Sequence, residues 1–148
     1  MTTAQRMVLG FIAAAISVLI FHQGMVLLLR EIGMLNPAAR VWNLAPNPFG
    51  VPQVLNLCFW GGLYGVAFGL LAPRFRLPMV VCGLLTGVAA MLVGLFVVPA
   101  IKGAPIGGGW AAQSWLRSFL INGFFGIGLG LIYPLLAERF FRPTLPSR

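Results

Sequence analysis

Four long apolar blocks limit what this sequence can fold into. They cover residues 7–29, 54–72, 79–98 and 118–136, and none contains an acidic residue, a lysine or an arginine. A helix needs about 20 residues to cross the ~30 Å hydrocarbon core of a bilayer. Backbone polar groups in lipid must be satisfied within such a segment, so each block is expected to be a helix. We therefore predict an all-α integral membrane protein whose residues 1–148 form one bundle of four transmembrane helices.

The composition also indicates a lipid environment. Of the 148 residues, 59% are hydrophobic and 8% are charged, whereas an average soluble domain has about 25% charged residues. A water-facing surface with so few charges would expose large apolar patches, so a soluble domain buried in a larger complex fits less well. The first block follows Arg6 as a signal peptide would, but no small-residue cleavage site follows its core, and a retained span is predicted.

The basic residues predict the orientation of the spans. The formal net charge is +8, but the basic residues stand singly or in pairs between the blocks, so no nucleic-acid partner is expected and the bilayer is. One side carries Arg6, Arg74, Arg76, Arg139, Arg142 and Arg148, and the other carries Arg30, Arg40, Lys102 and Arg117. The positive-inside rule then places both termini in the cytoplasm, and we expect a bacterial plasma (inner) membrane. The residues predicted at the outer interface are Arg30, Glu31, Trp42, Trp110, Trp115 and Arg117.

Proline and glycine mark the connections between the spans. Pro73 and Pro78 bracket a short link, which predicts a tight turn between the second and third spans. Residues 36–52 and 104–110 are rich in proline, glycine and asparagine, and they predict two stiff loops on the opposite side.

Two segments of the chain resemble each other. Residues 59–75 align without gaps on residues 124–140, sharing Phe-x-Gly-x-x-x-Gly at the start and Leu-Leu-Ala-x-Arg-Phe at the end. The alignment predicts an internal duplication in which each unit is a two-helix hairpin. Units with an even number of spans would be parallel repeats. Convergent placement of glycines is the alternative.

Glycines recur at four-residue spacing on three of the blocks. This spacing places them on one face of a helix, where another backbone can approach closely. Such a face serves either the packing of the bundle itself or contact with a partner subunit or a second copy of the chain. The glycines concerned are Gly61, Gly65, Gly69, Gly83, Gly87, Gly126 and Gly130.

Polar residues inside the blocks form the other candidate site. His22 and Gln23 lie in the first block, and Asn56 and Asn122 lie at similar depths in the second and fourth. Polar groups at such depth usually face a protein interior or a cavity. These four residues therefore predict either hydrogen bonds between helices or a polar pocket in the outer third of the bundle.

The sequence leaves two classes of function open. No catalytic set, metal-binding motif or cofactor site is recognisable, and no acidic residue lies within a block, so an enzyme is not expected. The first hypothesis is a non-catalytic accessory, assembly or scaffolding subunit of a larger membrane complex. The alternative is a small oligomeric transporter or channel, with His22, Gln23, Asn56 and Asn122 along the route.

Overall fold

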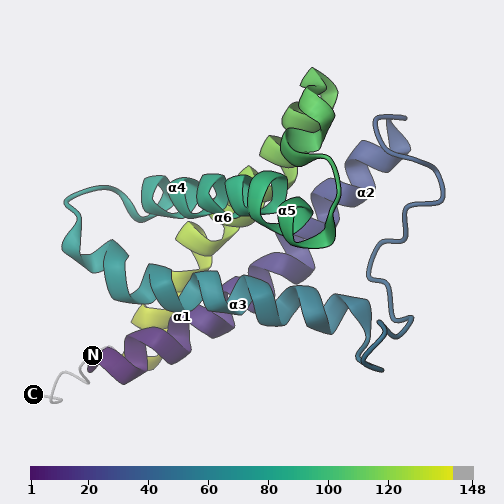
Figure 1. The fold of residues 1–148 in the computed structure, drawn as a ribbon. Helices are drawn as coiled ribbons and strands as arrows, with labels where there is room; N and C mark the ends of the chain where they lie inside the picture. Colours follow the sequence, from purple (N-terminus) through teal and green to yellow (C-terminus); the bar gives the residue numbers. More distant parts are fainter. Residues whose placement is uncertain (142–148) are drawn as a thin grey trace, which may run out of the picture.

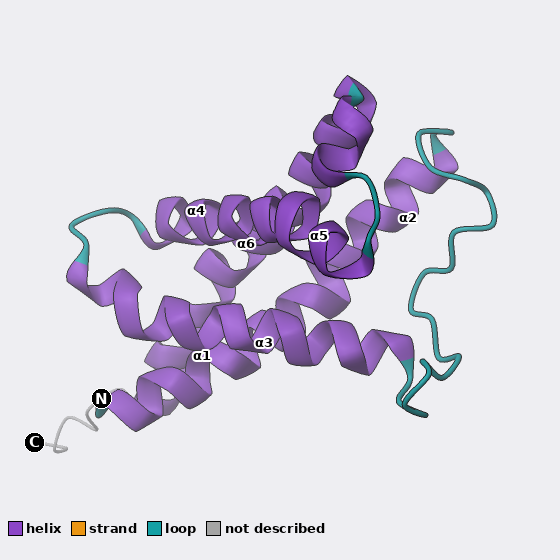
Figure 2. Cartoon of the chain, in the orientation of Figure 1, coloured by secondary structure: helices purple, strands orange, loops and turns teal. Residues whose placement is uncertain are grey.

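The computed structural model describes residues 1–141, and these are arranged as helices joined by loops (Figure 2). The first long helix consists of α1 (Thr3–Ser17), a π-helical turn η1 (Val18–His22) and α2 (Gln23–Glu31). The second is α3 (Gln53–Leu71), which ends in the 3-10 turn η2 (Ala72–Arg74). The third consists of α4 (Met79–Leu92), the π-helical turn η3 (Val93–Val97) and α5 (Val98–Lys102). The 3-10 segment η4 (Ile106–Trp110) leads into α6 (Ala112–Phe141).

Four of these helices are long and apolar enough to cross a membrane, as the sequence predicted. They cover Thr3–Glu31, Gln53–Arg74, Met79–Lys102 and Ala112–Phe141. All four extend beyond the predicted spans at one end or both. The largest difference is in the fourth, where the helix starts at Ala112 rather than near residue 118, because polar residues in its first turns do not stop a helix.

The chain runs up and down between two ends of the bundle (Figure 1). The N-terminus, the link between η2 and α4, and the last residues of α6 lie together at what we call the terminal end. The loops 32–52 and 103–111 lie toward the opposite end, the loop end. The predicted separation of the connections onto two sides therefore matches the fold.

The helices pack as two hairpins, α1 against α3 and α4 against α6, and the hairpins join through α1 and α6. A Cβ atom added at Gly10 would clash with the carbonyl oxygen of Gly65. In the second hairpin, a Cβ atom at Gly83 would clash with the carbonyl oxygen of Gly126. In both hairpins the helix backbones touch, which glycine alone permits and which favours association where lipid provides no hydrophobic drive.

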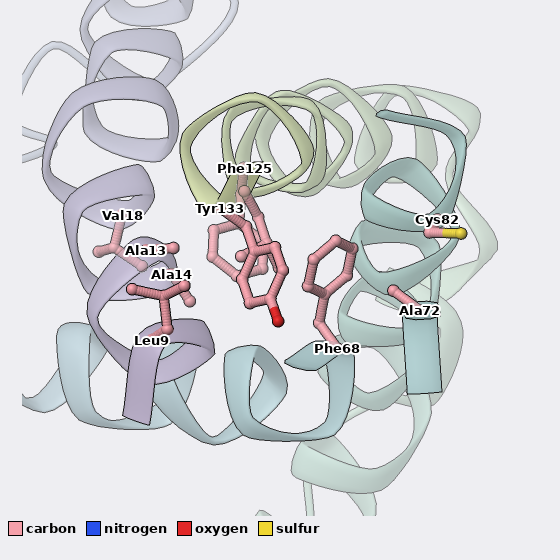
Figure 3. Close-up of a cluster of buried hydrophobic side chains, with 10 residues drawn as sticks. Leu9, Ala13, Ala14, Val18, Phe68, Ala72, Cys82, Phe125 and Tyr133 are labelled. Carbon is pink, nitrogen blue, oxygen red and sulfur yellow. The ribbon is translucent and has the colours of Figure 1, made fainter. Parts of the chain in front are cut away.

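The core lies where the four helices meet (Figure 3). Phe125 and Tyr133 extend from α6 beside Phe68 of α3, and the rings of Phe68 and Tyr133 pack edge to face at 5.3 Å. Small residues of α1, including Ala13 and Ala14, are fully buried on the other side of these rings. The aromatic residues fill the space that the small residues leave, so α3 and α4 make few direct contacts with each other.

Candidate functional site

His22 and Gln23 lie at the junction of η1 and α2, and Gln23 is only 3% exposed. The Oε1 atom of Gln23 accepts a hydrogen bond from the backbone N–H of Trp42 at 2.8 Å. Its Nε2 atom lies 3.4 Å from Nδ1 of His22. The buried amide thus connects the first long helix to the loop 32–52.

Trp42 makes a second contact with the same turn. Its indole Nε1 donates a hydrogen bond to the carbonyl oxygen of Leu19 at 2.8 Å. Leu19 lies within η1, where π-type hydrogen bonding widens the turn and frees a carbonyl from the regular helical pattern. Trp42 adopts a φ of 47°, which is uncommon for a residue with a side chain. We call the contacts of Trp42 with Leu19 and Gln23 the Trp42 strap.

Three other polar side chains within the helices donate hydrogen bonds to backbone carbonyls. Asn122 donates to Ser118 at 2.9 Å, and Thr86 donates to Cys82 at 2.9 Å, in each case within its own helix. The buried hydroxyl of Ser17 donates to the carbonyl oxygen of Phe125 at 2.6 Å and so connects the two hairpins.

Two open grooves mark the surface of the described residues. The larger, of about 280 Å³, is lined by Met7, Val8, Phe11, Ile12 and Val66. The smaller, of about 140 Å³, is lined by Ile20, Phe21, Gly24, Met25, Leu28 and Phe124. Both are apolar, and none of the four residues of the predicted polar pocket lines either groove.

The seven predicted glycines all lie on contact faces within the chain. Gly65 and Gly69 meet the backbone of α1, and Gly61 meets the side chain of Val18. Gly83 and Gly87 of α4 face α6, where Gly126 and Gly130 face α4 in return. These faces are therefore occupied by the chain's own helices. Sequence reasoning missed Gly10 and Gly128, although the spacing of Gly10 and Ala14 repeats the same small-residue pattern.

Three charged residues at the loop end, Arg30, Glu31 and Arg117, interact with other groups of the protein. Arg30 and Glu31 form a salt bridge at 2.7 Å, and Arg30 also donates to the carbonyl oxygen of Ala39. Exposed pairs of this kind contribute little to stability. Arg117 donates to the carbonyl oxygen of Met34 at 3.2 Å, which connects the start of α6 to the loop of the other hairpin.

An aromatic cluster covers the second loop. The indole rings of Trp110 and Trp115 stack at 6.0 Å, and Phe96 packs edge to face against both. The Nε1 atom of Trp115 donates to the carbonyl oxygen of Gly107 at 2.9 Å. Residues 107–110 all have a φ near +60°, so they form a left-handed turn that glycine tolerates and Trp110 adopts at a cost.

One face of α3 points away from the bundle and combines apolar and polar groups. It consists of Asn56, Phe59, Trp60 and Leu63, whose spacing places them on one side of the helix, and we call it the α3 face. Trp60 is 56% exposed and Phe59 is 51% exposed. Within residues 1–141, neither the indole N–H of Trp60 nor the amide of Asn56 has a hydrogen-bond partner.

No group of three or more His, Cys, Asp or Glu residues that could hold a metal ion is present within residues 1–141. Comparison with protein-family models, with curated proteins and with solved structures finds no significant match to this chain.

Proposed function

We propose that this chain is a non-catalytic accessory or scaffolding subunit that binds another membrane protein through the α3 face. The main support for the proposal is that the indole N–H of Trp60 has no hydrogen-bond partner within residues 1–141. This group lies about 10 Å along the helix axis from the start of α3, within a segment of membrane-spanning length. An unpaired donor facing hydrocarbon is costly, whereas an acceptor on a neighbouring helix would satisfy it.

The polar residues inside the bundle favour this proposal over transport. Four polar side chains form hydrogen bonds to the protein's own backbone, namely those of Gln23, Ser17, Thr86 and Asn122. Side chains held in this way stabilise a fixed arrangement of helices. The glycine faces are occupied as well. The α3 face, in contrast, presents an indole N–H and an amide that have no hydrogen-bond partner within residues 1–141.

The test is extraction of the full chain from its native membrane in a mild detergent, followed by native mass analysis. A stable complex with a second membrane protein is expected, and Trp60→Ala should release that protein. Phe124→Ala is the matched control, because Phe124 is a half-exposed aromatic residue on α6 at 43% exposure. Retention of the partner by both variants, or a chain that is monomeric in membranes and in detergent, would contradict the proposal. A pure homo-oligomer would favour the transporter or channel instead.

Asn56→Leu gives an independent test, because an amide that faces lipid and an amide that binds a partner helix predict different effects on the complex. If the Asn56 amide faces lipid alone, leucine should stabilise the isolated chain and leave its associations unchanged. If the amide binds a partner helix, the same change should weaken the complex while the isolated chain stays equally stable or becomes more stable.

A further inference from the structure

Four basic residues gather at the terminal end of the bundle. Arg6 is in the second turn of α1, Arg74 ends η2, Arg76 lies in the link to α4, and Arg139 is in the last turn of α6. The backbone carbonyl of Arg6 contacts Gly69, so α1 and the last turns of α3 lie side by side there. We call these four residues the basic patch; the segments that contain them lie at the terminal end of the bundle in Figure 1.

The guanidinium groups of the basic patch are largely unused by the protein. Within residues 1–141, the side chains of Arg6, Arg76 and Arg139 form no hydrogen bond or ion pair, and Arg74 donates to the carbonyl oxygen of Leu70. At the loop end, by comparison, Arg30 is paired with Glu31 and Arg117 is bound to Met34, while Arg40 and Lys102 are exposed. Free cations at a membrane surface attract anionic head groups.

An apolar groove begins next to the basic patch. The groove of about 280 Å³ starts at Met7, the residue after Arg6, and continues through Phe11 and Ile12 of α1 to Val66 of α3. It is therefore directed from the terminal end toward the middle of the bundle. A phospholipid has an anionic phosphate at one end and an apolar acyl chain beyond it. An apolar groove that begins next to basic residues matches this arrangement.

Tyr133 adds an unused donor near this end. The residue is 4% exposed, and its hydroxyl has no hydrogen-bond partner within residues 1–141. No side-chain oxygen of these residues is both buried and without a partner, so the hydroxyl oxygen of Tyr133 is accessible. Figure 3 shows the hydroxyl oxygen pointing away from α6 toward α3. A phenol hydroxyl can donate a hydrogen bond to the ester or phosphate oxygens of a lipid.

We infer that the basic patch is a binding site for an anionic phospholipid, with the phosphate among the arginines and an acyl chain in the adjacent groove. The inference is independent of the proposed partner surface, because the α3 face uses different residues. It also holds for either orientation of the chain, since it specifies which end of the bundle binds the lipid and not which compartment that end faces.

The experiment is native mass spectrometry of the full chain in detergent with phosphatidylglycerol and phosphatidylcholine of equal acyl length. Phosphatidylglycerol should bind in preference, and the Arg74→Gln/Arg76→Gln double variant should lose about 25-fold in its affinity, because each basic residue near an anionic surface contributes about fivefold. The matched control is Arg40→Gln/Lys102→Gln, which removes two exposed cations from the loop end and should keep the affinity. Equal binding of the two lipids, or equal losses in both double variants, would overturn the inference.

Three further arms distinguish the site from general attraction. Rising ionic strength should weaken phosphatidylglycerol binding by the unmodified chain and leave phosphatidylcholine binding unchanged, which tests the site even if a variant fails to fold.

Inorganic phosphate at millimolar concentration should not displace the lipid if the groove holds the acyl chain. Val8→Trp, which fills the groove at an exposed position, should lower the affinity severalfold, and Tyr133→Phe should lower it to a smaller extent. Displacement by phosphate together with no effect of Val8→Trp would rule out the acyl chain site.

Discussion

The two hairpins use the same means to bring their helices together and different means to hold their loops. In each, glycine lets two backbones touch, at Gly10 with Gly65 and at Gly83 with Gly126. In each, the first helix also contains a π-helical turn, η1 or η3. The loop of the first hairpin is held by hydrogen bonds of the Trp42 strap, whereas the loop of the second is held by stacked aromatic rings over a left-handed turn. The helices of both hairpins are thus joined by the same kind of backbone contact, whereas their loops are held by different interactions.

The largest effect is expected where the backbones touch. Gly10→Ala and Gly83→Ala should each lower the free energy of unfolding by about 3 kcal/mol, because the added methyl group would meet a backbone carbonyl that cannot move aside. The measurement is unfolding of the purified chain in mixed micelles at increasing dodecyl sulfate. If the two hairpins are equivalent, both variants should lose the same amount of stability. A loss in only one variant would show that the hairpins are not equivalent.

Two helical glycines without neighbours provide the control for this comparison. No atom lies within 4 Å of a Cβ added at Gly24 or Gly94. Alanine there should raise the stability by up to about 1 kcal/mol, since alanine favours the helix over glycine. A loss of stability in these variants would mean that glycine matters through backbone flexibility and not through close packing.

The Trp42 strap should give the next largest effect and only in the first hairpin. Gln23→Leu leaves the backbone N–H of Trp42 without its acceptor, which should cost about 2 kcal/mol. Hydrogen exchange of the amides in loop 32–52 should then accelerate, while exchange in loop 103–111 stays unchanged. Gln53→Leu, whose side chain forms no hydrogen bond within residues 1–141, is the matched control and should change neither loop. Acceleration in both loops would show that Gln23 supports the whole bundle.

The left-handed turn should give a smaller effect and only in the second hairpin. Gly109 has a φ of 65°, and no atom lies within 4 Å of a Cβ added there, so Gly109→Ala tests conformation alone. The expected loss is about 1 kcal/mol, opposite in sign to the gain expected for Gly94→Ala. The same dodecyl sulfate titration measures both variants, and a gain in stability for Gly109→Ala would contradict the left-handed turn.

The sequence predicted the helices well because span length and apolar composition are local properties. The tight link at Pro73 and Pro78 and the two loops were also predicted, since proline and glycine restrict the backbone residue by residue. The partners of the polar residues could not be predicted in this way. Gln23 binds Trp42 because a π-helical turn and a positive φ bring the loop back over the helix, and neither feature has a clear signature in the residues themselves. The glycine rows were visible, but whether they faced each other or a partner depended on the arrangement of the four helices. The predicted duplication and the predicted pocket stay predictions.

The smallest effect is expected at the contact that joins the hairpins to each other. The hydroxyl of Ser17 donates to the carbonyl oxygen of Phe125 at 2.6 Å, in a site where Ser17 is fully buried. Hydrogen bonds between helices in membranes contribute about 0.6 kcal/mol on average, because the same groups also find partners in the unfolded chain within the membrane. Ser17→Ala should therefore lower the free energy of unfolding by about 0.6 kcal/mol in the dodecyl sulfate titration. Thr86→Ala is the control, since the hydroxyl of Thr86 donates within its own helix. A loss above about 2 kcal/mol for Ser17→Ala alone would mean that the hairpins are held together mainly by this one polar contact. A loss near the average would instead assign their association to the packing of α1 against α6, where Gly128 lets Phe21 and Ser17 approach the α6 backbone.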